Sequence, residues 1–201
     1  MTWEVLSMIG TIAFAVSGAI VAMEEEYDIL GVYILGIVTA FGGGAIRNLL
    51  IGVPVSALWD QSLFFQIALL SITAVFLFPK NLLRHWQKWG NLFDAIGLSA
   101  FAIQGAIYAV KMEHPLSAVI VAAVMTGIGG GIIRDLLAGR KPMVLRLEIY
   151  ALWAILAGVI IGLKIASNPW ELYILFGIVT VLRVLSYTFD WKLPIRRIEE
   201  N

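Results

Sequence analysis

The chain has 201 residues, of which 60% are hydrophobic and 14% are charged. This composition is far from the average for globular proteins and indicates an integral membrane protein. Lysine plus arginine and aspartate plus glutamate each total 14, and this balance gives no indication of nucleic-acid binding. Cysteine is absent, which excludes disulfides and thiolate chemistry. We expect no cofactor.

Seven apolar runs predict seven transmembrane helices. A helix needs about 20 mostly apolar residues to cross the hydrocarbon core. Runs of about this length lie near 5–23, 29–50, 61–79, 92–110, 116–138, 147–164 and 171–189. The connections are too short to hold a soluble domain. We therefore expect an all-α integral membrane protein that forms a single membrane domain over residues 1–201.

Basic residues in the short loops predict the orientation in the cell membrane. Nine fall on one side of the predicted topology: Lys80, Arg84, Lys88, Arg140, Lys141, Arg146, Lys192, Arg196 and Arg197. The loops on the other side carry Lys111 and Lys164. This asymmetry places the amino terminus outside and the carboxyl terminus in the cytoplasm. Residues 1–4 carry no basic side chain, so we expect the first helix to be retained and not cleaved as a signal peptide.

An internal repeat covers most of the chain. A shift of 87 positions aligns residues 9–52 with 96–139 without a gap, and places "IGTIAFAVSGAI" on "IGLSAFAIQGAI". The predicted repeats cover about 5–79 and about 92–164, with the helix at 171–189 outside them. Because each repeat contains three helices, the second must enter the membrane inverted relative to the first. Inverted repeats are typical of transporters and of some channels, with the functional site near mid-membrane.

A glycine triplet occurs at the same place in both repeats, as Gly42, Gly43 and Gly44 and as Gly129, Gly130 and Gly131. Two interpretations are open. Small residues let membrane helices pack closely. Alternatively, the triplets weaken the helices and expose carbonyls along a polar path, which is tolerated where protein or water satisfies them. The repetition of the triplet three residues before an arginine favours the path.

Arg47 and Arg134 follow the triplets at equivalent positions. An arginine deep in a membrane helix costs about 2.5–3.5 kcal/mol on insertion scales, so it is expected to be paired or hydrated. Snorkelling to the interface is the alternative. Glu4 and Asp94 lie at depths similar to those of the two arginines. We therefore expect the ion pairs Glu4–Arg47 and Asp94–Arg134.

Polar residues are few at mid-membrane. Thr39 shares a helical stripe with Gly43 and Arg47, and Thr126 occupies the equivalent place in the second repeat. Ser17 and Gln104 are also equivalent to each other. Such hydroxyl, amide and carbonyl oxygens suit a monovalent cation or a small zwitterion better than a divalent ion, which prefers carboxylates. Each hydroxyl has the alternative of bonding back to the preceding turn of its own helix.

The paired segments "GGGAIRNLLIG" and "GGGIIRDLLAG", with the inverted repeat and a seventh helix, resemble the TRIC family of trimeric intracellular cation channels. The prokaryotic branch of that family is also catalogued as a putative glycine transporter domain. The resemblance implies a homotrimer with one pore in each subunit, with the second and fifth helices kinked at the glycines. It implies potassium as the permeant, with sodium as a further one. The pore-lining residues expected by analogy are Gly42, Gly43, Gly44, Gly129, Gly130, Gly131, Ser17, Thr39, Gln104 and Thr126. One departure is that Asn48 stands where the second repeat has Asp135, so a symmetrical role in cation attraction is in doubt.

The sequence thus predicts a potassium channel that contacts membrane lipids. The alternative is a secondary transporter of glycine or another small zwitterion, in which helix starts would face the carboxylate. Absence of a charged residue at mid-membrane to fix a zwitterion favours the channel. A scaffold without a permeant would leave the duplicated polar stripes unexplained. An enzyme is not expected, because no nucleophile–base pair or metal constellation is visible.

Overall fold

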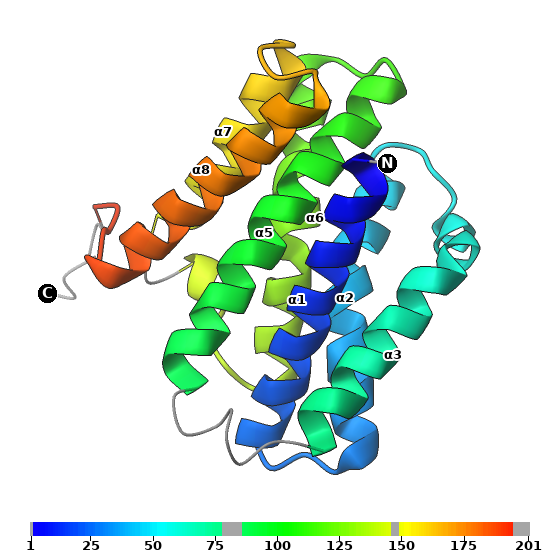
Figure 1. Ribbon diagram of the computed structural model, residues 1–201, viewed down its shortest axis with the longest axis vertical. Coiled ribbons are helices and arrows are strands. Elements are labelled where there is room, and N and C mark those ends of the chain that lie inside the picture. The colour runs from blue at the N-terminus through cyan, green and yellow to red at the C-terminus, as the bar shows by residue number, and fades with distance from the viewer. Residues whose placement is uncertain (1, 78–85, 146–148, 195–201) are drawn as a thin grey trace, which may run out of the picture.

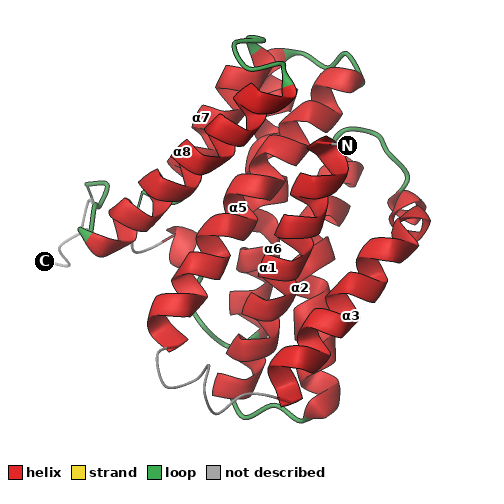
Figure 2. Cartoon of the chain, in the orientation of Figure 1, coloured by secondary structure: helices red, strands yellow, loops and turns green. Residues whose placement is uncertain are grey.

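The computed structural model describes residues 2–77, 86–145 and 149–194, which form helices joined by turns and loops. These ranges hold the α-helices α1 (Thr2–Glu24), α2 (Ile29–Leu50), α3 (Ser62–Leu77), α5 (Trp86–Lys111), α6 (Leu116–Leu137), α7 (Ala151–Gly162) and α8 (Pro169–Thr188). Short 3-10 helices, η1 (Val55–Gln61) and η2 (Met143–Leu145), precede α3 and α7. The described residues contain no strand (Figure 2). The predicted all-α class is confirmed.

Local sequence signals set several helix ends. Asp28 caps α2, where its carboxylate accepts from the Gly31 amide at 2.8 Å, which satisfies a free donor of the first turn. Gly52 and Gly139 follow α2 and α6 with φ of +76° and +68°. Glycine adopts this left-handed conformation without a Cβ penalty, and it commonly ends helices for that reason. These two glycines are equivalent positions of the sequence repeat.

Four helices form the centre of the molecule. α1, α2, α5 and α6 pack against one another, while α3 lies against α1 and α2 and the α7–α8 pair lies against α5 (Figure 1). α1 and α5, which carry equivalent sequences, run in opposite directions (Figure 1). The start of α1 and the end of α8 lie toward opposite ends of the bundle (Figure 1).

Within the described residues, six helical segments are long and apolar enough to cross a membrane. The chain is a multi-pass membrane protein. The span expected at 147–164 is shorter than predicted, because α7 has 12 residues. At about 1.5 Å per residue such a helix is roughly 18 Å long, against a hydrocarbon core of about 30 Å. It ends where Lys164 adopts a φ of +58°. The predicted ends of repeat one at 78–79 and of this span at 147–148 lie outside the described residues, as do Lys80, Arg84, Arg146, Arg196 and Arg197.

Candidate functional site

Two glycines bring α2 and α6 into backbone contact at the centre of the bundle. A Cβ added to Gly43 would lie 2.5 Å from the Thr126 carbonyl oxygen. A Cβ on Gly130 would overlap the carbonyl oxygen of Thr39. Since backbone atoms cannot rotate aside, any side chain here would force the helices apart. The second glycine of each triplet therefore serves close packing.

The first and third glycines of the triplets have different surroundings. A Cβ on Gly42 would meet the end of the Ile133 side chain. A Cβ on Gly129 would lie 3.1 Å from the Gly43 Cα and 3.3 Å from the end of the Ile46 side chain. Gly44 has nothing closer than 3.8 Å, and Gly131 has the Tyr150 hydroxyl at 3.5 Å. The third glycine of each triplet thus lies beside the arginine of its own repeat, and Gly131 also lies beside Tyr150 and Asp94.

Both helices continue through their triplets. The α-helix α2 extends without interruption from Ile29 to Leu50, and α6 from Leu116 to Leu137. The interpretation in which the triplets open the helices and free their carbonyls is therefore wrong. Close approach of α2 to α6 keeps this backbone protected, which offsets the low helix propensity of glycine.

One polar cluster, the Arg47 cluster, comprises Ser7, Arg47, Asn48, Gln104 and Tyr108. Arg47 is only 1% exposed. Its Nε and Nη2 donate to Asn48 Oδ1 at 3.1 and 2.8 Å, and its Nη1 donates to Gln104 Oε1 at 3.3 Å. The Gln104 amide donates to the Ser7 hydroxyl at 2.8 Å. The guanidinium also lies 4.5 Å from the centre of the Tyr108 ring, a cation–π contact.

The expected partner of Arg47 is not among these groups. Glu4 is exposed, and among the described residues no ion pair joins it to Arg47. The predicted Glu4–Arg47 ion pair is therefore wrong. The physical reason is that Arg47 is buried inside the bundle, where Asn48 and Gln104 accept three of its N–H groups.

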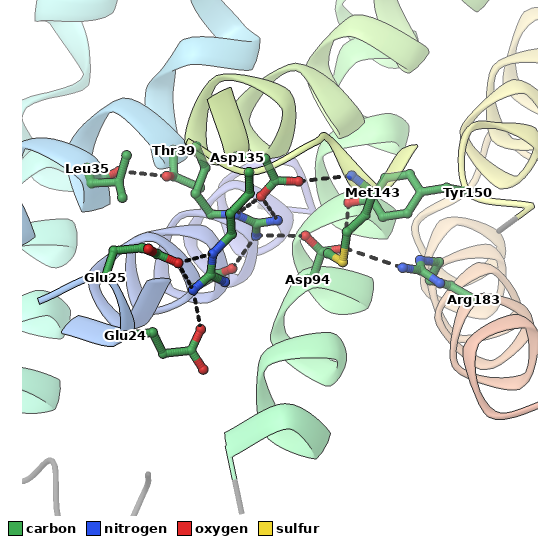
Figure 3. A network of polar contacts seen from close by, with 12 residues as sticks. Glu24, Glu25, Leu35, Thr39, Asp94, Asp135, Met143, Tyr150 and Arg183 are labelled. Atoms are coloured by element: carbon green, nitrogen blue, oxygen red, sulfur yellow. Dashed lines mark hydrogen bonds and ion pairs between the residues drawn. The ribbon is translucent and has the colours of Figure 1, made fainter. Parts of the chain in front are cut away.

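The second polar cluster, the Arg134 cluster, comprises Ser17, Asp94, Arg134, Asp135, Tyr150 and Arg183. The predicted Asp94–Arg134 ion pair is formed, at 3.0 Å. Asp94 also accepts from the Tyr150 hydroxyl at 2.5 Å and lies 3.8 Å from Arg183 (Figure 3). All three side chains are buried. A single carboxylate therefore joins α5, α6, the start of α7 and α8.

Asp135 completes this cluster. Its Oδ1 lies 2.7 Å from Arg134 Nη2, and its Oδ2 accepts from the Met143 amide at 3.1 Å (Figure 3). Asp135 is 4% exposed. Asn48 holds Arg47 from the equivalent position, so each residue orients the arginine that precedes it in the chain.

The arginine of each repeat donates to a mid-helix polar residue of the other repeat. Arg47, from the first repeat, donates to Gln104 of the second. Arg134, from the second, donates to Ser17 of the first at 2.5 Å. Ser17 and Gln104 thus act as acceptors for arginines, and the two repeats complete each other's clusters.

Thr39 and Thr126 bond to their own helices. The Thr39 hydroxyl donates to the Leu35 carbonyl at 2.6 Å (Figure 3). The Thr126 hydroxyl donates to the Ala122 carbonyl at 2.5 Å. Each hydroxyl proton is therefore used within the preceding turn, and only the oxygen lone pairs remain for another ligand.

A narrow pocket adjoins the Arg47 cluster. Its lining residues are Thr11, Ala40, Phe41, Gly44, Arg47, Leu58, Gln61, Phe101, Gln104 and Thr126. The space inside is about 20 Å³, which is room for about one water molecule. Beside the Arg134 cluster, Ile128, Ile132, Met143 and Val144 fill the equivalent region.

Two phenylalanines fill the centre between the clusters. Phe14 and Phe101 are equivalent in the repeat, and their rings pack edge to face with centroids 5.2 Å apart. Both are buried. Phe101 also lines the Arg47 pocket, so the pocket ends against this aromatic pair.

Sequence reasoning missed several residues of the two clusters. Ser7 is detectable from the repeat, since it is the counterpart of Asp94. Arg183 has a weaker signal, because a single arginine within an apolar helix is expected to be buried and paired. Tyr108 and Tyr150 have no such signal, because their roles depend on how α5 and α7 pack.

The acidic turn at the end of α1 forms ion pairs with an arginine side chain. Arg140 donates to Glu25 at 2.6 Å and to Glu24 at 2.8 Å (Figure 3). These groups are about one-third exposed. The two carboxylates therefore stabilise the loop after α6 at this end of the bundle.

Comparison with known proteins identifies the family of this chain. A family model described as a glycine transporter matches residues 4–80 and again residues 91–164. A prokaryotic TRIC channel crystallised in 0.5 M KCl is 34% identical, covers 95% of this chain and 98% of its own, and superposes with a TM-score of 0.87. The chain belongs to the TRIC family.

Further relatives match nearly the whole chain. The TRIC orthologue of Rhodobacter sphaeroides is 33% identical, with a TM-score of 0.84 over 93% of this chain and 97% of its own. The UPF0126 membrane protein YvgT of Bacillus subtilis is 78% identical over 98% of this chain and 97% of its own length. The inner membrane protein YadS of Escherichia coli is 37% identical, over 98% and 97% respectively.

Proposed function

We propose that this protein is a cation channel, with potassium as its main permeant and sodium as a further one. Each subunit carries its own pathway, between α1, α2, α5 and α6. The observation that carries the proposal is the pair of arginine clusters at the ends of one central group of helices, joined by the glycine contact of α2 and α6. Similarity to TRIC cation channels at 33–34% identity over nearly the full chain supports it.

The described conformation corresponds to a closed pathway under this proposal. Phe14 and Phe101 form the constriction, and the Gly43–Gly130 contact forms the adjoining wall. Gly44 and Gly131 line the two mouths, together with Gly42 and Gly129 on the flanking turns. Conduction then requires the Phe14–Phe101 pair and the helices beside it to separate. Ser17, Thr39, Gln104 and Thr126 offer oxygen lone pairs to a monovalent cation along that route.

The architecture that we propose is an inverted repeat. The double match of one family model and the opposite directions of α1 and α5 support a two-fold axis in the membrane plane. The clusters then lie near opposite faces, with Arg47 toward the outside and Arg134 toward the cytoplasm. α8 lies outside the repeat, and three subunits form a homotrimer surrounded by lipid.

Current across a planar bilayer tests the channel. Purified protein in asymmetric KCl should give unitary steps that reverse near the potassium potential. Gly44→Leu should abolish them, because the new side chain fills the Arg47 pocket, where the nearest other atoms lie 3.8 Å from the Cβ position. Gly177→Leu is the matched control, since nothing lies within 4 Å of that position on α8. Steps that persist in Gly44→Leu would contradict a pathway past Gly44.

Glycine transport is the second candidate, favoured by the description of the family model. A glycine molecule is larger than the one-water space beside Arg47, so transport would need a larger cavity in another conformation. Saturable uptake of labelled glycine into liposomes, without unitary current from the same preparation, would favour the transporter over the channel.

A further inference from the structure

The two arginine clusters match in position but differ in charge. The 87-residue shift pairs Arg47 with Arg134, Asn48 with Asp135, and Ser7 with Asp94. Both carboxylates around Arg134 are therefore replaced by neutral side chains around Arg47. The replacement keeps the hydrogen-bond acceptors, since Asn48 accepts from Arg47 at 2.8 Å as Asp135 accepts from Arg134.

The Arg47 cluster consequently carries an uncompensated positive charge. In the Arg134 cluster, the two arginines are balanced by Asp94 and Asp135. Around Arg47, no carboxylate of the described residues forms an ion pair with the guanidinium. A charge that is 99% buried is costly unless a counter-charge accompanies it.

The space needed by a counter-ion lies beside this arginine. The Arg47 pocket has a volume of about 20 Å³, whereas the region beside Arg134 has no comparable space. Hydrogen bonds to Asn48 and Gln104 use three N–H groups of Arg47, and a guanidinium has five. Two N–H donors therefore remain for a ligand.

The pocket contains nothing that would repel an anion. Its polar lining, apart from Arg47, consists of the neutral Thr11, Gln61, Gln104 and Thr126. The carboxylates of Glu4 and Asp60 are exposed at this end of the bundle. The local charge is thus positive, and Phe41, Leu58 and Phe101 are among the apolar lining residues.

We propose that the Arg47 pocket binds a monovalent anion of halide size, chloride in physiological media. The anion supplies the negative charge that Asp94 and Asp135 supply around Arg134. Its size follows from the space beside Arg47, which has room for about one water molecule. The binding does not depend on permeation, so it stands or fails separately from the proposed channel.

Bromide is the probe for this site, because its anomalous scattering locates it in a crystal. Crystals of the wild-type protein grown in NaBr should show an anomalous peak within hydrogen-bonding reach of the Arg47 guanidinium. Asn48→Asp should remove the peak, because it installs the carboxylate that the other repeat has at this position. Ser7→Asp, the counterpart of Asp94, is the second variant if Asn48→Asp does not fold. Wild-type crystals without a peak at an ordered Arg47, or a peak that both variants keep, would overturn the proposal.

Thermal unfolding gives an independent reading. A ligand that binds the native state raises Tm with its concentration. At constant ionic strength, chloride in place of methanesulfonate should raise the Tm of the wild type and leave that of Asn48→Asp unchanged. An equal rise in both would show a general salt effect and refute the site.

Added glycine tests whether the pocket binds a halide ion or an amino-acid carboxylate. Added at saturating concentration to the NaBr crystals, it should leave the bromide peak in place, because its carboxylate carries more atoms than the pocket accepts. Loss of the peak with glycine density against Arg47 would contradict a halide-sized site and assign the pocket to an amino-acid carboxylate.

Discussion

The contact between α2 and α6 gives a quantitative prediction at Gly43. Alanine at this position places its Cβ 2.5 Å from the Thr126 carbonyl oxygen. Ordinary contacts between such atoms lie near 3.5 Å, so the two helices must separate by about 1 Å. Overpacking of this kind costs about 1–3 kcal/mol. The better helix propensity of alanine returns only about 0.5–1 kcal/mol.

The assay is thermal unfolding of the purified protein. The net cost is then at most about 2.5 kcal/mol. For a chain of this size, 1 kcal/mol corresponds to about 2–4 °C in Tm, so Gly43→Ala should lower Tm by up to about 10 °C. Gly177→Ala is the control, since a Cβ there meets nothing within 4 Å. Gly44→Ala, with its nearest neighbours at 3.8 Å, should leave Tm unchanged or raise it. If all three variants have the same Tm, the glycines do not set the helix spacing and the packing argument fails.

Three further predictions concern charged groups and orientation. Asp94→Asn should lower the free energy of unfolding by about 3–5 kcal/mol, because it leaves the Arg134 charge without its partner on α5. Chemical denaturation measures this free energy, and a decrease no larger than that of the exposed control Asp190→Asn would refute the prediction. Arg140→Gln should cost less than about 1 kcal/mol, an effect that shrinks in high salt because its ion pairs are partly exposed; an equal cost in low and high salt would disagree with this. In this cysteine-free chain, Ser167→Cys should react with an impermeant maleimide added outside intact cells and Glu25→Cys should not; the opposite pattern would reverse the predicted orientation.

The sequence predicted the parts of the fold that depend on local pattern. Apolar runs located the helices, and the order of the helices placed Asp94 at the depth of Arg134, where the ion pair forms. The length of α7 could not be predicted, since apolar composition continues on both sides of a helix that ends at Gly162. The effect of the glycines also depends on tertiary structure, because close packing of α2 against α6 preserves helices that propensity alone would weaken.

Partner choice at the arginines was the least predictable feature. Glu4 has the charge to pair with Arg47, yet neutral Asn48 and Gln104 take that place. An argument from charge alone favours an acidic partner. Inside the bundle, the partner is the acceptor that helix packing brings within hydrogen-bonding distance. The repeat itself contained better information, since it pairs Ser7 with Asp94 and so indicates that the two arginines differ in their surroundings.

The exchange of polar partners between the repeats also bears on how the protein is made. α2 is synthesised before α5, so Arg47 exists before Gln104 and Tyr108 are available to it. Until they arrive, Asn48 is its acceptor within the same helix. The first three helices therefore remain an incomplete intermediate during biosynthesis. Completion of the Arg47 cluster requires the second half of the chain, which supplies Gln104 and Tyr108.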